Sequence, residues 1–430
     1  MIRHRLPACL LSLLALPLGA ADYPPAATAM ELGIMQGRPV PSANRVTLAN
    51  WMSPPFNRWS LQHLPEILPT ATVYRSNEPP ARLPERKRDL AALRFEVPPG
   101  ETLSIAEWLA ASSTDGFIVV HDGEIAFEAY LNNLRPETHH LTYSISKSVI
   151  GIVAGILAGD GSLDVTRKVE AYVPELAGSG FAGYSVRDLL DMQAAIAWQE
   201  DYADPNGQWR RWKAAIGWLP AAADAGVAPE GNYSFLRTLP RDPAWPGGFK
   251  YVSPTAEVLG WVLERAGGMP LAGLISHRLW MPLGTEHDAF ITTDRSFAAA
   301  AAGGFGATLR DLARFGQMVL NDGRFNGRQV VASEWIADIR TNGSNQAWRT
   351  GQYRGYWNPE GAYRSLWYVA GDADGSFEAI GIHGQRLHIN PARKLVIVRL
   401  SSGAEPVSRS DYDLSSRAIA AIGATLSARQ

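Results

Sequence analysis

Residues 143–159 have the sequence Tyr143-Ser-Ile-Ser-Lys-Ser-Val-Ile-Gly-Ile-Val-Ala-Gly-Ile-Leu-Ala-Gly159. Apolar residues occupy nearly every position after Lys147, so a helix formed by this stretch has no polar face. We therefore expect a buried helix over Ser144–Leu157 rather than an amphipathic one. Ser144 stands where the helix begins, and Gly159 is the expected stop.

The clearest β-strand signal precedes this helix. Residues 117–130 contain two stretches rich in β-branched and aromatic residues on either side of Asp122-Gly123. This dipeptide is typical of a two-residue hairpin turn of the primed type. Near the other end of the chain, Phe377–His388 and Leu395–Leu400 are expected to form two adjacent strands, and roughly the last 20 residues a closing helix.

Sequence signals also mark where helices start between these regions. Ser185-Val-Arg-Asp188 and Thr308-Leu-Arg-Asp311 match the capping box, in which two side chains bond the free N–H groups of a first helical turn. Ser253 is the expected N-cap of another helix, with Pro254 at its first position and Gly267-Gly268 at its end.

The elements therefore occur as strands with a buried helix, then helices, then strands with a helix again. This order fits an α+β fold with an all-helical insertion. We expect four divisions of the chain: 1–21, a signal peptide; 22–100, an extended N-terminal region; 101–160 together with 300–430, an α/β catalytic domain; and 161–299, a mainly helical domain.

Composition excludes several protein classes. The 430 residues are 46% hydrophobic and 19% charged, which excludes a disordered chain, a coiled coil and a collagen-like repeat. The formal net charge is -2 and the chain has no long basic run. Nucleic-acid binding is therefore not expected, because its affinity depends on neutralising phosphates.

The N-terminus predicts a secretory signal peptide. Met1–Arg5 is basic, Leu6–Leu18 is apolar, and cleavage is expected after Ala20 or Ala21. The apolar run is shorter than the roughly 20 residues that span a bilayer, which disfavours a membrane anchor. The single cysteine, Cys9, lies in this segment. A periplasmic or secreted mature chain would contain no cysteine, which excludes thiol catalysis, cysteine-bound zinc and disulfides.

Ser144 and Lys147 lie one helical turn apart, so their Cβ atoms are roughly 5–6 Å from each other. A serine hydroxyl needs a neighbouring base to act as a nucleophile. Burial in an apolar helix lowers the pKa of a lysine towards a useful range, and the helix N-terminus favours an oxyanion. The pair predicts acyl transfer; the alternative is a helix-capping serine beside a lysine that extends to solvent.

Two further motifs accompany this pair: Tyr251-Val-Ser-Pro and Gly381-Ile-His-Gly-Gln385. With residues 143–148 they occur in the order and rough spacing of the serine β-lactamase-like hydrolases. The chain resembles the class C β-lactamase and family VIII carboxylesterase group, and within it the 6-aminohexanoate-dimer hydrolases, over most of residues 50–420. The resemblance implies a β-lactamase/transpeptidase-like fold, with an antiparallel sheet flanked by helices, and an acyl-enzyme mechanism without metal or organic cofactor.

The resemblance also implies roles for individual residues. Ser144 would be acylated, Lys147 would be the base or proton relay, and Tyr251 would pass a proton to the leaving group. The backbone N–H groups of Ser144 and Ile382 would form the oxyanion hole. A phenol becomes useful only beside a positive charge, which Lys147 is expected to supply; the alternative for Tyr251 is a buried core aromatic.

Three further residues are weaker candidates for substrate binding. Tyr202 would contact the scissile group of the substrate, and Trp218 would close over the bound substrate. For both residues, a purely structural role in side-chain packing is an equally good alternative to substrate binding. His383 belongs to the third motif, and packing beside the catalytic strand is its alternative role.

Departures from the family pattern narrow the expected substrate. Tyr251-Val-Ser253 lacks the asparagine with which β-lactamases bind the drug's side chain, and Ala379–His383 lacks the lysine that recognises its carboxylate. Weak or no β-lactamase activity is therefore expected. Trp209–Lys213 is basic, whereas activity on nylon oligomers is helped by acidic groups near the substrate amine, so we expect an apolar or anionic acyl part.

Together these features predict a secreted or periplasmic serine hydrolase that acts on small-molecule esters or amides. A cell-wall D-amino-acid peptidase or β-lactamase is one alternative, and a non-catalytic binding protein that keeps the fold is another. The sequence contains no Gly-x-Ser-x-Gly elbow, no His-Glu-x-x-His motif and no phosphate-binding loop.

Overall fold

The computed structural model describes residues 23–97, 100–220, 231–354 and 358–428. The predicted signal peptide, with Cys9 and both candidate cleavage positions, lies outside the described residues. The strands are β1 (Thr70–Val73), β2 (Arg94–Glu96), β3 (Thr102–Ser104), β4 (Thr114–His121), β5 (Glu124–Tyr130), β6 (His140–Leu141), β7 (Ala289–Thr292), β8 (Phe305–Ala307), β9 (Arg324–Phe325), β10 (Arg328–Gln329), β11 (Ala362–Arg364), β12 (Trp367–Val369), β13 (Phe377–Gly381), β14 (Gln385–Asn390) and β15 (Leu395–Ser401).

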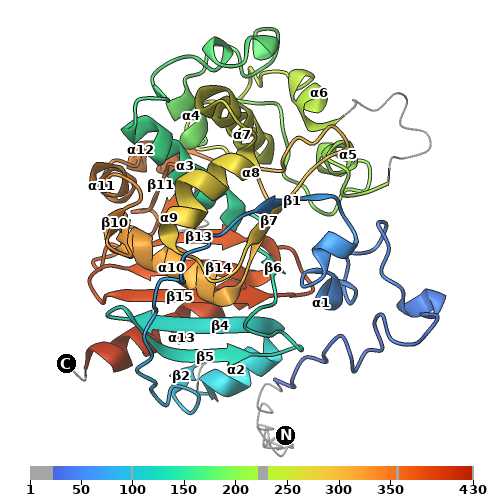
Figure 1. Ribbon diagram of the computed structural model, residues 1–430, viewed down its shortest axis with the longest axis vertical. Coiled ribbons are helices and arrows are strands. Elements are labelled where there is room, and N and C mark those ends of the chain that lie inside the picture. The colour runs from blue at the N-terminus through green and yellow to red at the C-terminus, as the bar shows by residue number, and fades with distance from the viewer. Residues whose placement is uncertain (1–22, 98–99, 221–230, 355–357, 429–430) are drawn as a thin grey trace, which may run out of the picture.

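Helices cover both faces of the larger sheet and fill the upper half of the molecule in Figure 1. The α-helices are α1 (Asn57–Ser60), α2 (Ile105–Ala111), α3 (Ile145–Gly159), α4 (Val186–Leu190), α5 (Gln208–Ala215), α6 (Gly231–Arg237), α7 (Ser253–Gly267), α8 (Leu271–Leu274), α9 (Met281–Leu283), α10 (Leu309–Leu320), α11 (Ser333–Thr341), α12 (Asn345–Thr350) and α13 (Arg409–Ser427). A π-helical segment, η5 (Ile275–Trp280), joins α8 to α9, and the short 3-10 turns are η1 (Ser42–Asn44), η2 (Leu64–Glu66), η3 (Val169–Ala171), η4 (Pro174–Leu176) and η6 (Ile382–Gly384).

The larger sheet has seven antiparallel strands in the order β11-β12-β13-β14-β15-β4-β5. Because side chains alternate along a strand, each central strand serves two cores. Phe117 and Val119 of β4 face the core that contains α2 and α13, whereas Ile118 and Val120 face the main core. Helix α10 packs on β15, β4 and β14. The sheet is therefore flanked by helices on both faces, as predicted.

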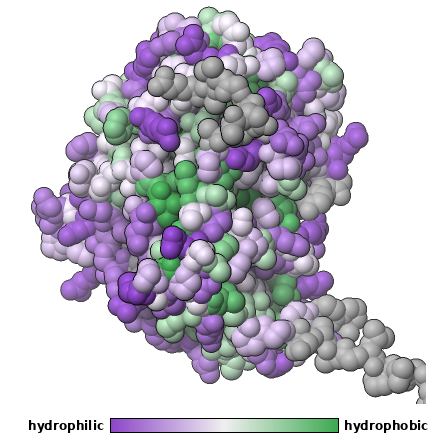
Figure 2. All heavy atoms as spheres, turned by 90° about the vertical axis from the view of Figure 1, so that its right-hand side faces the viewer, coloured by the Kyte–Doolittle hydropathy of each residue, from purple (hydrophilic) through white to green (hydrophobic). Residues whose placement is uncertain are grey.

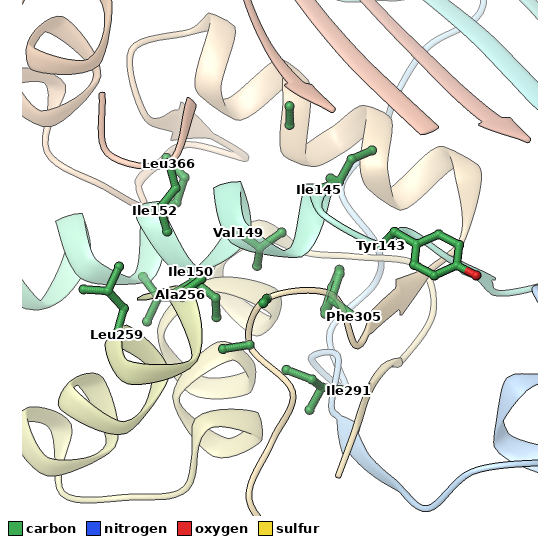
Figure 3. Close-up of a cluster of buried hydrophobic side chains, with 14 of the residues drawn as sticks. Tyr143, Ile145, Val149, Ile150, Ile152, Ala256, Leu259, Ile291, Phe305 and Leu366 are labelled. Carbon is green, nitrogen blue, oxygen red and sulfur yellow. The ribbon is translucent and has the colours of Figure 1, made fainter. Parts of the chain in front are cut away.

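Helix α3 runs through the main core, and twelve of its residues are buried. Figure 3 shows Val149, Ile150 and Ile152 of α3 among hydrophobic side chains that include Ala256 and Leu259 of α7. The prediction of a buried helix is thus confirmed. A smaller sheet, in the order β1-β7-β8-β6, ends at β6, from which the chain enters α3.

The N-terminal region, predicted to be extended, also contributes regular structure to the body of the protein. Its strand β1 pairs antiparallel with β7, so the mainly helical segment 161–299 and the N-terminal region share a sheet. Trp51 is fully buried, and its indole N–H donates to the Trp218 carbonyl oxygen at 2.7 Å. The segment therefore completes the core.

Several local predictions are confirmed. The β4–β5 turn has positive φ at Asp122 (51°) and Gly123 (81°), as a primed turn requires. Ser185 and Asp188 form the capping box at the start of α4. Gly268 ends α7 in the left-handed conformation, and α13 is the closing helix.

Other local predictions are wrong in detail. Helix α3 continues through Gly159 and is followed by Gly161 at φ 82°, so the later glycine makes the turn. Ser253 is the first residue of α7 rather than its N-cap, because its hydroxyl is bound by a glutamate instead. Phe377–His388 is two strands, since the chain reverses through η6 with His383 at φ 62°.

The capping box at Thr308 is only half formed, although α10 begins there. The Thr308 hydroxyl accepts the Asp311 N–H, but the Asp311 carboxylate accepts the N–H groups of Glu286 and His287. Among the described residues, no helix is long and apolar enough to cross a membrane.

Candidate active site

Ser144 is presented at the start of α3 by an unusual backbone. Tyr143 has φ 45°, a conformation that is strained for a bulky residue and that recurs at functional sites. In Figure 3 its ring points away from the hydrophobic cluster at the beginning of α3. The Ser144 side chain makes no capping hydrogen bond to the helix. Instead, its Oγ accepts a hydrogen bond from Lys147 Nζ at 2.9 Å.

Lys147 does not extend to solvent, so the alternative of a capping serine beside a surface lysine is wrong. The side chain is buried (1% exposed), and Nζ also donates to the Ala302 carbonyl oxygen at 2.7 Å. Burial lowers the pKa of Lys147 to about 8, and the carboxylates of Glu200 and Glu257 partly oppose this. A fraction of the amine is therefore neutral near pH 7 and able to accept a proton from Ser144.

Tyr251 lies just before α7, and its ring is close to the same amine. Lys147 Nζ is 5.1 Å from the ring centroid. Burial raises the pKa of Tyr251, and Glu200 raises it further, while hydrogen bonds from the Ser144 and Tyr368 hydroxyls oppose the shift. The expectation of a more acidic phenol is wrong, because burial and the charge of Glu200 raise the Tyr251 pKa. Tyr251 therefore remains a neutral hydroxyl that can relay a proton.

The turn after β13 lies against the segment that leads into α3. A Cβ at Gly381 would lie 2.6 Å from the Thr142 carbonyl oxygen, so only glycine permits this approach. The next residue, Ile382, lines the same cavity as Ser144. Both residues of the predicted oxyanion pair, Ser144 and Ile382, thus line one cavity.

This cavity has a volume of about 730 Å³. Tyrosines gather around the serine: Tyr202, Tyr251, Tyr353 and Tyr368 all line the cavity. Val407 also lines it and is 58% exposed. On the face shown in Figure 2, hydrophobic side chains gather near the middle and polar ones surround them.

Tyr202, the weaker candidate for contact with the scissile group, lines the cavity, and Glu200 lies next to it. Glu200 Oε1 accepts hydrogen bonds from the Ser253 hydroxyl at 2.6 Å and from the Tyr202 hydroxyl at 3.4 Å. Burial, followed by the charge of Glu200, raises the pKa of Tyr202. Tyr202 therefore presents a neutral hydroxyl to the cavity.

Trp218 lies in the core rather than at the cavity, so its predicted role as a closing residue has no support in this placement. It is buried (1% exposed), and its indole N–H donates to Thr292 Oγ1 at 3.0 Å. The basic stretch 209–213 also lies away from the cavity. Lys213 Nζ lies 3.9 Å from the Trp218 ring centroid, and Arg211 is exposed. These groups do not favour an anionic acyl part.

His383 lines the cavity, and its ring is 5.3 Å from the Tyr143 ring, centroid to centroid. Its Nδ1 donates to the Gly403 carbonyl oxygen at 2.8 Å. Burial lowers the pKa of His383 to about 4, so the ring is neutral at physiological pH. It cannot serve as the cation that binds a substrate carboxylate.

Sequence analysis missed one buried carboxylate. Glu257 of α7 is 1% exposed and accepts the backbone N–H groups of Ala301 and Ala302. The available signal was an acidic residue within the otherwise uncharged stretch 254–263. The described residues contain no cluster of three or more histidine, cysteine or acidic side chains that could hold a metal ion.

The chain is similar to proteins of known family and to solved structures. The beta-lactamase family pattern matches residues 109–422. The 6-aminohexanoate-dimer hydrolase of Paenarthrobacter ureafaciens is 37% identical over 378 residues, which cover 88% of this chain and 93% of that protein.

Solved structures show the same relationship. A candidate 6-aminohexanoate-dimer hydrolase from Bacillus anthracis superposes with a TM-score of 0.83 at 30% identity, covering 90% of this chain and 98% of that one. A class C beta-lactamase from Rhodobacter sphaeroides has a TM-score of 0.51 at 16% identity, over 73% of this chain and 96% of that one, which shows the fold alone.

Proposed function

We propose, from the premise that this chain belongs to the beta-lactamase family, that it is a serine hydrolase that cleaves carboxylic esters or amides through an acyl-enzyme. The observation that carries the proposal is the 2.9 Å contact between Lys147 Nζ and Ser144 Oγ inside an apolar helix. A buried amine with a lowered pKa in contact with a serine hydroxyl is an activated nucleophile.

The proposed reaction uses three side chains and two backbone N–H groups. Neutral Lys147 accepts the hydroxyl proton as Ser144 Oγ attacks the substrate carbonyl carbon. The N–H groups of Ser144 and Ile382 stabilise the resulting oxyanion. Tyr251 donates its proton to the departing alcohol or amine and regains one from Lys147. Water then cleaves the acyl-enzyme by the reverse proton path, with the same residues as bases.

The substrate class follows from the cavity and from the relatives. The Paenarthrobacter ureafaciens relative is named as a hydrolase of the 6-aminohexanoate dimer. The tyrosine-rich cavity supports a compact ester or amide with an apolar acyl part as the substrate. The missing asparagine and lysine of the β-lactamase motifs support weak or no action on β-lactams. A cell-wall peptidase or β-lactamase, and a non-catalytic binding protein, remain the alternatives.

Intact-protein mass spectrometry after brief exposure to a p-nitrophenyl ester panel tests the proposal. We expect a mass increase equal to one acyl group in place of one hydrogen, localised to Ser144, together with a burst of p-nitrophenol. The panel should pair acyl groups that carry a cationic or an anionic end with apolar ones of equal length. We expect the apolar esters to react fastest.

The alternatives give different results. Hydrolysis of a chromogenic β-lactam at a rate comparable to the esters would support the β-lactamase alternative. Absence of labelling by both the esters and a fluorophosphonate would support the binding protein and end the proposal.

The pKa of Lys147 sets the expected pH dependence. Because the base must be neutral, kcat/KM for an ester should rise as the pH increases and level off above about pH 8. Well below that pH it should fall about tenfold for each pH unit. A profile that is flat below pH 8, or that rises as the pH falls, would contradict Lys147 as the base.

We also propose, from the basic and apolar N-terminal sequence alone, that residues 1–21 direct secretion or export to the periplasm. The division into an α/β catalytic domain and a mainly helical domain likewise remains a proposal. In it the site lies where α3, α7 and the β13–β14 turn meet.

A further inference from the structure

A buried carboxylate on α7 lies next to the amine of the active site without touching the serine. Glu257 Oε1 accepts the Ala302 N–H at 3.0 Å, and Oε2 accepts the Ala301 N–H at 2.9 Å. Asn232 Nδ2 also donates to Oε2, at 2.8 Å. Both oxygens are therefore engaged, and the two successive peptide groups are fixed from one side.

Ala302, whose N–H is held in this way, is also the residue whose carbonyl oxygen holds Lys147. The Ala302 carbonyl oxygen accepts Lys147 Nζ at 2.7 Å, and the same Nζ donates to Ser144 Oγ at 2.9 Å. Ala302 thus links the two sets of contacts: Glu257 fixes the peptide group on its N-terminal side, and the carbonyl group on its C-terminal side holds the amine that contacts the serine. A lysine ammonium sits on a flexible four-carbon stem, so a fixed acceptor is needed to hold the amine in place.

Helix α7 positions both Glu257 and Tyr251. Tyr251 lies two residues before α7, and Glu257 lies within its first turns. Ser253, the first residue of α7, binds Glu200, which also faces the amine. The phenol and the carboxylate that fixes the amine are therefore placed by one helix.

Two carboxylates and a second amine carry the charges that act on Lys147. Glu200 and Glu257 favour the ammonium form of Lys147. The second buried amine, Lys213, faces the same two glutamates, and its pKa is lowered by burial. Tyr251 is neutral and contributes no charge. Removing the charge of Glu257 therefore leaves the cationic form of Lys147 less stable.

We propose that Glu257 is the positioning residue of the Ser144–Lys147 pair: it orients the Ala302 carbonyl that holds the Lys147 amine against the serine hydroxyl. This inference rests on the proposed function. It adds a residue that touches neither substrate nor reacting atoms and that acts through a backbone peptide.

A structural role alone would make Glu257 a stabiliser of the 301–302 loop with no effect on the amine. Two variants separate the possibilities. Glu257→Gln removes the charge and presents an N–H group where an acceptor is required. Glu257→Asp keeps the charge, but it is one methylene shorter and cannot reach both peptides. Asp311→Asn is the control, because Asp311 is equally buried and also accepts two backbone N–H groups, at the start of α10.

The readouts are the pH profile of kcat/KM with p-nitrophenyl butyrate and an NMR titration of protein labelled with ¹³C at lysine Cε, with Lys147→Met used for assignment. We expect Glu257→Gln to shift both the pH range over which kcat/KM rises (the rising limb) and the Lys147 titration to lower pH. The maximal kcat/KM at high pH (the plateau) should fall about 10²-fold. Glu257→Asp should reduce the plateau while the limb stays in place. Asp311→Asn should lower the melting temperature and leave both the limb and the titration unchanged.

The inference is overturned if Glu257→Asp, which retains the buried charge, folds and keeps both the parent plateau and the parent titration. It is also overturned if Glu257→Gln folds and leaves the Lys147 titration unchanged. The NMR titration needs no turnover. If the parent protein hydrolyses no ester, the proposed function fails, while the titration still decides whether Glu257 governs the amine.

Discussion

The Ser144→Ala variant should lose hydrolysis of p-nitrophenyl esters by on the order of 10⁴- to 10⁶-fold and should form no acyl-enzyme. Its Oγ is the atom proposed to bond the acyl group, and it is the hydroxyl oxygen that accepts the Lys147 amine. The melting temperature should change little, because the Ser144 side chain caps no helix N–H. Steady-state kinetics, intact mass and thermal unfolding measure these three results.

Ser148→Ala provides the matched control from the same helix. The Ser148 hydroxyl is buried and donates to the Leu366 carbonyl oxygen at 2.7 Å, one turn further along α3. Its loss should lower the free energy of unfolding by about 1 kcal/mol and leave ester hydrolysis intact. If Ser144→Ala retains the parent rate, the acyl-enzyme proposal is abandoned.

The Lys147→Met variant should lose at least about 10³-fold in kcat/KM, because the serine then has no base. Methionine has a similar length and suits the apolar surroundings. The fall in the lysine pKa from 10.5 to about 8 corresponds to roughly 3 kcal/mol of destabilised ammonium. Replacing the buried ammonium group with methionine removes this destabilisation. The gain offsets the about 1–3 kcal/mol of folding free energy lost when the Ala302 carbonyl oxygen has no partner.

The free energy of unfolding of Lys147→Met should therefore remain within about 2 kcal/mol of the parent value, measured by urea titration. Lys213→Met is the control, since it removes a second buried amine that lies 3.9 Å from the Trp218 ring centroid and not against the serine. Its ester hydrolysis should stay within about tenfold of the parent. Equal losses in both variants would argue against a specific role for Lys147.

Features set by local chain geometry could be predicted from the sequence. The Ser144–Lys147 contact follows from helical spacing, and the burial of α3 follows from its composition. The primed turn at Asp122-Gly123 has the same local origin. Each depends on a few adjacent residues, so no knowledge of distant segments is needed.

Features that depend on distant segments could not be predicted. Tyr251 could be assigned to the site only through the family resemblance, because no local sequence pattern links it to Lys147. Trp218 was expected to close over the substrate, but it is buried in the core. Its burial depends on partners such as Trp51, which is distant in the sequence, so no local pattern could reveal it. The chain reversal at His383 was not predicted, because residues 377–388 have the composition of one continuous strand. Gly384 was the available turn signal in the sequence, and it adopts φ 89° in the structure.

The N-terminal region has one further consequence. The family pattern starts at residue 109, yet Asn57 Nδ2 donates to the Ser402 and Gly403 carbonyl oxygens, and the Gly403 carbonyl oxygen also accepts the His383 ring Nδ1–H. Strand β1 likewise protects the edge of β7. An excised 109–422 fragment would have an exposed, aggregation-prone strand edge and a loosened turn beside Ile382. Truncated expression clones, fusions and variant libraries must therefore carry this leading segment, because it forms part of the folded unit.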